Sequence, residues 1–350
     1  MREKTFSNNW TFQMREKTSS SNRKFQILWY NPPPFLRVFR TDTMHCGFAK
    51  CKYSNCDMTF SKLEANISQA VIFDGYRMPQ NLTFTRPNGQ IWIFAHHEPP
   101  RAYRASEWWN KIDLFNWTMT YNKDIADIFL PYGEILRHKR NVIRDFKSIA
   151  QNKNRTLLLV TSHCQTRSKR LEYVKVLQKC IDVEVLGLCG KNWSCGQRLR
   201  HGDNCFQLLN TFKFYLAFEN SLCHQYFTEK FYENFSFDSI MLIRGGSHGE
   251  ARQLFPKGTH IATDDFKTIK DLGNFLKHLS VDKYAHLLQR KSQYYSPGYL
   301  KVYQRAMCNI CKRMNFMNKY TKIITNIQKE AFGLRPCHQS KDVTKIRRLY

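Results

Sequence analysis

The sequence of 350 residues contains no uninterrupted apolar run of about 18 residues, the length that a transmembrane helix needs. Residues 1–20 are polar and charged, and they hold none of the apolar core that marks a secretory signal peptide. The pentapeptide Met-Arg-Glu-Lys-Thr occurs at 1–5 and again at 14–18, as in an altered N-terminus. Residues 1–22 are therefore expected to be unstructured and to carry no information about the fold.

The sequence also lacks any block of about five or six consecutive basic residues, the pattern of a basic arm that grips nucleic acid. Lys and Arg nevertheless outnumber Asp and Glu by 55 to 28, a formal net charge of +27. Such a balance suits an anionic partner such as a phosphate-bearing substrate, and a solvated basic surface is the plain alternative. Because the basic residues are scattered, we expect no nucleic-acid partner. Apolar residues at 42% and aromatic residues at 14% exclude a disordered chain.

Twelve cysteines are many for a cytosolic protein, and their number is even. Seven Asn-x-Ser/Thr triplets accompany them, at Asn9, Asn66, Asn81, Asn116, Asn154, Asn192 and Asn234. Together they favour a secretory, oxidising compartment, with Asn66, Asn81, Asn154 and Asn192 as glycosylation candidates. No second Cys-x-x-Cys or histidine pair completes a zinc site with Cys308 and Cys311. A local disulfide between these two cysteines is expected, and no bound metal.

Apolar segments alternate with helical patterns along the chain, which predicts an α/β fold. Phe25–Tyr30 and Ile91–Ala95 are typical of strands in a first unit, residues 23–150. Thr156–Thr161 is a near-continuous apolar run, as expected for a parallel strand covered on both faces, and it opens a second unit, residues 151–297. Residues 298–350 follow as a basic C-terminal segment that contains the Cys-x-x-Cys motif.

Several polar side chains follow the predicted strand Phe214–Phe218, and ligands bind at such strand ends in open parallel sheets. A carboxylate pair can bind sugar or ribose hydroxyls, while Lys230 and Arg170 can neutralise a pyrophosphate. The candidates here are Glu219, Asn220, Tyr226, Glu229 and Lys230. On the residues alone, an ordinary helix start with exposed Glu229 and Lys230 is the favoured alternative.

Glu98 follows the apolar strand Ile91–Ala95 and is held by Pro99 and Pro100. A rigid loop after a buried strand suits a general base, whose position matters more than its identity. A surface carboxylate in a turn explains the same spacing equally well. The neighbouring pair His96 and His97 is more often structural than metal-binding.

These segments resemble the motifs of the family-10 α1,3-fucosyltransferases, and the similarity runs from about Phe25 to Tyr284. The family's GDP-fucose signature resembles Phe218-Glu-Asn-Ser221 followed by Tyr226-Phe-Thr-Glu-Lys230. Further matches are Phe115–Tyr121 with Ile128–Gly133, Ser168-Lys-Arg170 with Asp182–Gly187, and the catalytic loop His97-Glu-Pro-Pro100.

The resemblance implies a GT-B fold, in which two Rossmann-like domains face a central cleft. Residues 23–150 would bind the acceptor and residues 151–297 would bind GDP-fucose. Glu98 would deprotonate the acceptor hydroxyl in an inverting transfer, and Arg170 and Lys230 would bind the pyrophosphate. Glu229 would face the fucose and ribose, Tyr226 the guanine, and Glu219 and Asn220 would complete the donor site. No cofactor is implied, since an Asp-x-Asp metal motif is neither expected nor seen, and a divalent cation would at most stimulate.

The resemblance also implies the acceptor and the location. The product would carry fucose in α1,3 linkage to N-acetylglucosamine of a glycoprotein glycan, with core and outer-branch acceptors both open. The form His97-Glu-Pro-Pro100 is more like that of invertebrate members, which favours core fucosylation. Members of the family are type II Golgi proteins held by an N-terminal membrane anchor that this chain lacks.

Four positions depart from the family pattern. His163 stands where an Asn is usual, and Gln225 where an acidic residue commonly precedes the signature Tyr. Ile240–Ile243 lacks a usual proline, and no Trp occurs in Leu288–Tyr295. The alternative function is therefore a catalytically degenerate member that binds glycan or nucleotide without turnover.

Overall fold

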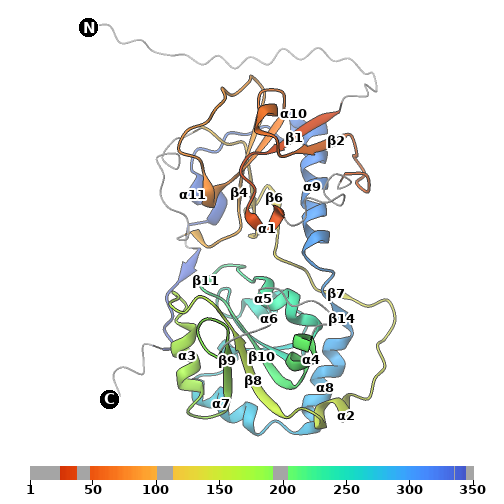
Figure 1. Cartoon of the computed structure of the whole chain (residues 1–350), viewed down its shortest axis with the longest axis vertical. Helices are drawn as coiled ribbons and strands as arrows, with labels where there is room; N and C mark the ends of the chain where they lie inside the picture. Colours follow the sequence, from red (N-terminus) through yellow and green to blue (C-terminus); the bar gives the residue numbers. More distant parts are fainter. Residues whose placement is uncertain (1–23, 38–47, 101–112, 192–203, 335, 344–350) are drawn as a thin grey trace, which may run out of the picture.

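The computed structural model describes residues 24–37, 48–100, 113–191, 204–334 and 336–343. Two parallel β-sheets with their helices lie one above the other along the long axis of the molecule (Figure 1). This arrangement confirms the expected α/β class. Within the described residues, no helix is both long enough and apolar enough to cross a membrane.

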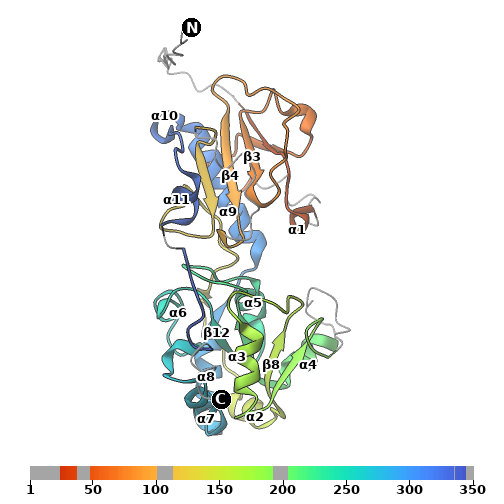
Figure 2. The ribbon, with the colours of Figure 1, turned by 90° about the vertical axis from the view of Figure 1, so that its left-hand side faces the viewer.

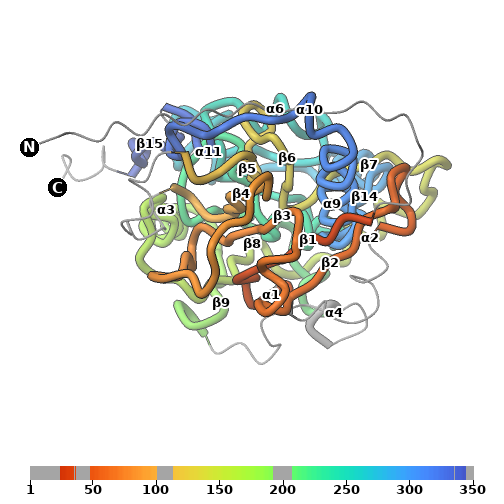
Figure 3. The backbone as a smooth tube through the Cα atoms, turned by 90° about the horizontal axis from the view of Figure 1, so that it is seen from above, coloured from red at the N-terminus to blue at the C-terminus, as the bar shows by residue number. Residues whose placement is uncertain are grey.

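The upper sheet has six strands in the order β2-β1-β3-β4-β5-β6. Its strands β2, β1, β3 and β4 follow one another across the view from above (Figure 3). Every residue of β3 and β4 is buried, because helices cover both faces of the sheet. This double burial explains why these strands are continuous apolar runs in the sequence. The strands are β1 (Phe25–Trp29), β2 (Cys56–Thr59), β3 (Ala70–Asp74), β4 (Ile91–His96), β5 (Trp117–Thr120) and β6 (Ile128–Phe129).

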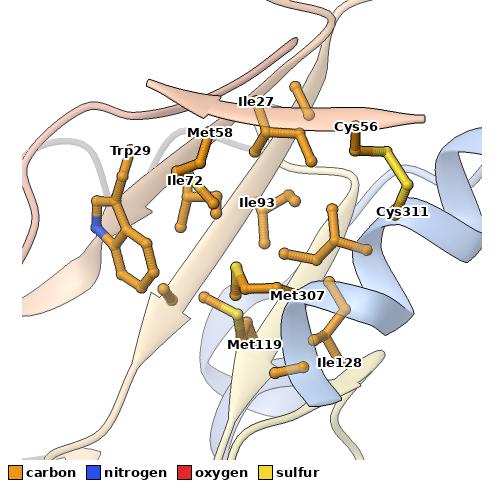
Figure 4. Close-up of a cluster of buried hydrophobic side chains, with 14 of the residues drawn as sticks. Ile27, Trp29, Cys56, Met58, Ile72, Ile93, Met119, Ile128, Met307 and Cys311 are labelled. Atoms are coloured by element: carbon orange, nitrogen blue, oxygen red, sulfur yellow. A yellow bond between two sulfur atoms is a disulfide. The ribbon is translucent and has the colours of Figure 1, made fainter. Parts of the chain in front are cut away.

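Two helices from the end of the chain cover the faces of the upper sheet. Met307 and Ile310 of α9 (Tyr299–Asn315) pack on the face that carries Ile72 and Ile93 (Figure 4). Residues of α11 (Ile327–Phe332) pack on the opposite face, with Phe73 and Phe94. Shorter elements of this unit are α1 (Pro34–Arg37), η1 (Lys62–Glu64), η2 (Gly75–Arg77) and α10 (Met317–Tyr320).

The lower sheet has five parallel strands in the order β13-β12-β10-β8-β9, the doubly wound arrangement with a switch point between β8 and β10. The strands are β8 (Arg155–Val160), β9 (Val183–Leu186), β10 (Phe212–Phe218), β12 (Ile240–Arg244) and β13 (His260–Ala262). One face packs on α2 (Phe146–Gln151), α3 (Arg170–Leu177), α7 (Ile269–Lys277) and α8 (Val281–Ser292). The other face packs on α4 (Asn204–Asn210), α5 (Glu229–Tyr232), η5 (Glu233–Ser236) and α6 (Glu250–Leu254), and η6 (Thr263–Asp265) follows β13.

The basic segment that begins at residue 298 packs on both units. After α8 the chain returns to the upper sheet as α9, because the apolar face of that helix is needed to cover β1, β3 and β4. It then descends along the lower unit (Figure 2), where β15 (Cys337–His338) pairs antiparallel with β11 (Leu222–Cys223). A second short antiparallel pair is formed by β7 (Leu136–Arg137) and β14 (Tyr294–Tyr295).

The disulfides correct the predicted pairing of Cys308 with Cys311. Cys308 and Cys311 are both oxidised, but they bond to Cys51 and Cys56 and not to each other. Cys308 and Cys311 lie about one helical turn apart on the face of α9 that packs on the upper sheet. Each therefore meets a cysteine from the part of the chain that forms the upper unit. Two further disulfides are Cys164–Cys189 and Cys223–Cys337. The expected oxidised state of the chain is therefore confirmed for these eight cysteines.

The predicted glycosylation sites differ in accessibility from other Asn-x-Ser/Thr triplets. Asn66, Asn81 and Asn154 are exposed, whereas Asn192 lies outside the described residues. Asn116 is buried and uses its side-chain oxygen to accept a hydrogen bond from the backbone N–H of Trp92. A glycan cannot be attached to such a side chain in the folded protein.

Candidate active site

The candidate residues gather where strands of the two sheets end. Arg170 is the first residue of α3, which follows β8, and Glu219 directly follows β10. These two strands flank the switch point of the lower sheet, where a crevice for ligands is expected. Glu98 lies just past the end of β4 in the upper sheet. The structure brings these three strand ends together.

A hydrogen bond joins the two units at the predicted base. The Tyr226 hydroxyl donates to Glu98 Oε2 over 3.3 Å, and the side chain of Asn220 also hydrogen-bonds to Glu98. Burial raises the pKa of the Glu98 carboxyl, and the negative charge of Glu229 raises it further. Lys230 and the two hydrogen bonds act in the opposite direction, but the net pKa remains above the ordinary value. Glu98 is thus a carboxylate with enhanced affinity for a proton.

The two histidines before Glu98 support the loop. His97 Nε2 lies 3.0 Å from the carbonyl oxygen of Leu130, and the Tyr132 hydroxyl donates to the His97 carbonyl over 2.5 Å. Burial lowers the pKa of His96 to about 3 and that of His97 to about 4, so both rings are neutral near pH 7. Across the described residues, no group of three or more His, Cys, Asp or Glu side chains could hold a metal ion.

Glu219 is buried, and its carboxylate holds Thr228 in place through hydrogen bonds. The side chain is 1% exposed, and its carboxylate accepts hydrogen bonds from the Thr228 backbone N–H at 2.7 Å and from the Thr228 hydroxyl at 2.8 Å. Gly245 faces the same carboxylate, since a Cβ there would lie 2.7 Å from Glu219 Cγ. Both carboxylate oxygens accept hydrogen bonds from Thr228, so in this structure Glu219 positions Thr228, and its role in donor binding stays a prediction.

Lys230 sits between two carboxylates at the start of α5. Its ammonium group lies 2.8 Å from Glu229 Oε1 and 3.9 Å from Glu219 Oε2. Burial lowers the pKa of Lys230, but the two carboxylates outweigh that effect and raise it. Burial alone would raise the pKa of Glu229. The positive charge of Lys230 outweighs this effect, so the net pKa of Glu229 is lowered. Both groups therefore stay ionised, with Thr228 capping the helix by accepting from the Lys230 N–H.

Arg170 is deeply buried, with 2% of its surface exposed. Its guanidinium donates to the carbonyl oxygens of Phe218 at 3.0 Å and His163 at 2.9 Å. Within the described part of the chain, its Nε has no hydrogen-bond partner, and neither has Oδ1 of Asn220. Buried polar atoms without partners are rare in proteins, so these two atoms mark a place where a ligand can complete the bonding.

Tyr226 occupies a different position from the one predicted for a residue that stacks on guanine. The ring is 1% exposed and packs edge-on against Tyr121 and Tyr132, with centroid distances of 5.1 and 5.9 Å. Neither face of the ring is free for a base in this structure. Its hydroxyl instead fixes Glu98, which is a role that spacing in the sequence could not indicate.

The residues before Tyr226 form a second link between the units that the sequence did not reveal. His224 Nε2 lies 2.8 Å from Asp124 Oδ2, and its Nδ1 lies 2.6 Å from Glu250 Oε1. The Gln225 side-chain oxygen accepts a hydrogen bond from the Lys123 backbone N–H at 2.7 Å. Asp124 and Lys123 follow β5 of the upper sheet, so this clamp holds both units beside Glu98 and Tyr226. A cavity of about 250 Å³ between the units adjoins it, lined by Tyr132 among others.

The chain matches two family models. Residues 22–133 match "Fucosyltransferase, N-terminal", and residues 150–330 match "Glycosyltransferase family 10 (fucosyltransferase) C-term". The second match alone spans more than half of the chain.

Individual relatives agree with the models. The chain is 31% identical over 239 residues to glycoprotein 3-alpha-L-fucosyltransferase A of Drosophila melanogaster, covering 67% of this chain and 46% of that one. It is 27% identical over 303 residues to alpha-(1,3)-fucosyltransferase C of the same organism, covering 78% and 67%. The match thus spans about half to two thirds of these curated relatives.

Among solved structures, an alpha1,3-fucosyltransferase crystallised with GDP-fucose superposes with a TM-score of 0.50 at 16% identity, over 79% of this chain and 84% of that one. This likeness confirms the expected GT-B fold. By its sequence, its family models and its fold, this chain belongs to glycosyltransferase family 10, the fucosyltransferases.

Proposed function

We propose that this protein is an inverting α1,3-fucosyltransferase that uses GDP-fucose as donor and N-acetylglucosamine of a glycoprotein glycan as acceptor. One observation carries the proposal most directly. The Tyr226 hydroxyl lies 3.3 Å from Glu98 Oε2, which brings the base of the upper sheet to the donor signature of the lower sheet. The exposed glycosylation triplets and the disulfides support the lumen of the Golgi as its location.

The proposed reaction assigns a step to each group. Glu98 takes the proton from an acceptor hydroxyl, whose oxygen forms a bond to the anomeric carbon of fucose as the bond to the β-phosphate oxygen breaks. The electron pair of that bond leaves with GDP, and the configuration inverts. The raised pKa of Glu98 suits a base, because a stronger affinity for the proton increases the driving force for its transfer.

The lower unit would stabilise the leaving group. Lys230 carries a positive charge that acts on Glu98, and Arg170 has an unpartnered Nε that can donate to a pyrophosphate oxygen. Asn220 Oδ1 can accept from a donor hydroxyl, and Glu229, 46% exposed in its side chain, can bind the sugar or ribose. These cations would serve the pyrophosphate without a metal, so we propose that no cofactor is required.

Acceptor-dependent release of GDP from GDP-fucose tests the proposal. We expect Glu98→Gln to reduce kcat by about 10²–10⁴-fold, the usual contribution of a general base, while the affinity for GDP is retained. Tyr226→Phe is the matched variant: it removes the hydroxyl that fixes Glu98 but leaves the base, so a smaller loss is expected. Activity of Glu98→Gln close to the wild type would contradict this assignment. Binding of GDP-fucose without turnover on a broad glycan panel would favour the degenerate alternative.

Mass spectrometry of the products from an N-glycan panel identifies the acceptor. Fucose on the core N-acetylglucosamine or on an outer branch would be distinguished by fragment masses. Absence of product from every acceptor containing N-acetylglucosamine would refute the proposed acceptor class while leaving donor binding to be measured separately.

A further inference from the structure

A histidine between two carboxylates joins the two units close to the catalytic loop. His224 Nε2 lies 2.8 Å from Asp124 Oδ2 of the upper unit, and its Nδ1 lies 2.6 Å from Glu250 Oε1 of the lower unit. We call these three side chains the His224 clamp. Resting on the proposed function, we propose that His224 is a positioning residue, which in its protonated form ties the units together and so holds Tyr226 and Glu98 in the geometry for transfer.

The two carboxylates require a proton on each nitrogen of the His224 ring. A neutral imidazole has one N–H group and one acceptor nitrogen, so it can donate to one carboxylate while its bare nitrogen repels the other. The imidazolium form donates to both. Because histidine exchanges this proton near neutral pH, the clamp is complete at acidic pH and loses one of its two contacts as the pH rises.

Asp124 is the partner that is released. Its side chain is 59% exposed, whereas that of Glu250 is 8% exposed. Glu250 Oε2 also accepts from the backbone N–H of Gln225 at 2.8 Å and of Ser247 at 2.7 Å, which fixes this carboxylate beside His224. The contact between His224 and Glu250 therefore stays within the lower unit, and the contact with Asp124 crosses the cleft.

The surroundings of the clamp keep Asp124 ionised. The hydrogen bond from His224 lowers the pKa of Asp124, and the charge of Lys123 lowers it further. Asp124 is therefore a carboxylate throughout the range in which histidine exchanges its proton. The other titratable groups on the elements around the clamp are Tyr121, Tyr226, His248, Asp264 and His338.

Two residues link His224 to the proposed base. Gln225 has a φ of 54°, in the left-handed region that residues with a side chain seldom adopt, so its contacts have to hold it there. One of these contacts is its N–H bond to Glu250, the same carboxylate that meets His224. Tyr226 comes next in the chain and donates to Glu98. The segment that carries His224 thus also carries the hydroxyl that fixes the base.

The two contacts are also neighbours in the upper unit. Asp124 lies in the loop after β5, and Glu98 lies in the loop after β4. These strands pair in parallel, with His96 opposite Thr120 at their ends. Release of Asp124 from the clamp therefore allows the edge of the upper sheet that carries Glu98 to move away from Tyr226.

The pH dependence of transfer tests the inference. Initial rates of the full chain are measured with GDP-fucose and an N-glycan acceptor at pH 6 and pH 8, and each variant is compared with the wild type at the same pH so that other titrations cancel. We expect His224→Gln to lower kcat about threefold at pH 6, since partly exposed ion contacts contribute modestly, and to match the wild type at pH 8. An equal loss at both pH values would overturn the inference, because His224 would then have a structural role alone.

Asp124→Asn keeps the contact across the cleft but removes its dependence on the proton. The amide oxygen accepts from the protonated ring, and the amide NH₂ group donates to the bare nitrogen of the neutral ring. We therefore expect kcat of this variant relative to the wild type to rise about threefold from pH 6 to pH 8. A relative kcat that does not rise would overturn the inference, even if His224→Gln fails to fold.

His248→Gln is the matched control. His248 is 79% exposed and lies 3.3 Å from Asp264 of its own unit, so its removal leaves the contact across the cleft in place. We expect kcat of this variant to equal that of the wild type at both pH values. A loss at pH 6 as large as that of His224→Gln would overturn the inference, because it would then follow from any histidine of this region.

Small-angle X-ray scattering with GDP and no acceptor separates this inference from the proposed function. We expect the radius of gyration of the wild type to be larger at pH 8 than at pH 6, and that of Asp124→Asn to stay at its pH 6 value. This pattern without turnover of any acceptor would refute the transferase activity but support the clamp. Turnover with one radius at both pH values, and with parallel pH profiles for the wild type and His224→Gln, would overturn the clamp and leave the proposed function standing.

Discussion

Replacing Glu219 with Gln should change how the stability of the protein depends on pH. Burial raises the pKa of Glu219 to about 7 from its usual 4.5, although Lys230 opposes the shift. The folded protein therefore binds this proton more tightly than the unfolded chain does. The stabilisation from Glu219 is fully present below about pH 4.5 and is lost as the pH rises through about 7.

The size of this effect follows from the two pKa values. The difference between 4.5 and about 7 corresponds to at most about 3 kcal/mol of unfolding free energy. Gln at this position keeps an oxygen that can accept from the Thr228 N–H and an amide that can donate to the Thr228 hydroxyl, but it has no proton to lose. The wild type should therefore become less stable relative to Glu219→Gln as the pH rises from 5 to 8.

Thermal unfolding followed by fluorescence at several pH values measures this difference. A change of about 3 kcal/mol corresponds to roughly 6–12 °C in the relative Tm. Glu172→Gln, an exposed carboxylate on α3, is the matched control and should follow the wild type at every pH. If the Tm difference between wild type and Glu219→Gln is the same at pH 5 and pH 8, the reasoning about the buried carboxyl is wrong.

Three further predictions concern the tail, the disulfides and the glycans. Asp342→Ala leaves the buried Arg244 without its counter-charge, so we expect a loss of about 2 kcal/mol and faster proteolysis of the tail at 336–343; unchanged proteolysis would contradict this. Peptide mapping without reduction should recover the pairs Cys51–Cys308 and Cys56–Cys311, and a Cys308–Cys311 peptide would disprove the pairing. Glycopeptide mapping after secretory expression should find sugar at Asn66, Asn81 or Asn154 and none at the buried Asn116, where any occupancy would be inconsistent with the fold.

The strands and strand ends were predictable because their signals are local. Thr156–Thr161 is apolar throughout since β8 lies between covered faces, and the polar residues after Phe218 mark the end of β10. Thr228 is of a residue type that favours the N-cap position, and it does cap α5. Such features depend on neighbours within a few residues, which a single sequence displays.

The long-range contacts were not predictable from one sequence. The basic segment after Gly298 gave no sign that α9 would complete a core formed some 200 residues earlier, because an amphipathic helix fits any apolar surface. The same ambiguity led to the wrong local pairing of Cys308 with Cys311, whose partners are 257 and 255 residues away. Likewise, the bond between Tyr226 and Glu98 joins residues 128 positions apart.

The departures from the family pattern are tolerated by the geometry of the site. His163 contributes its backbone carbonyl to Arg170, so the identity of its exposed side chain does not affect that bond. Gln225 uses a side-chain oxygen to accept from the Lys123 N–H, as a carboxylate at this position could do equally. Ile240–Ile243 lies in β12, which pairs with strands on both sides, and a chain without proline there loses no ladder hydrogen bond. Because none of these changes removes a contact of Glu98, Arg170 or Lys230, they weigh little against turnover, and the degenerate alternative has no support in the arrangement of these residues.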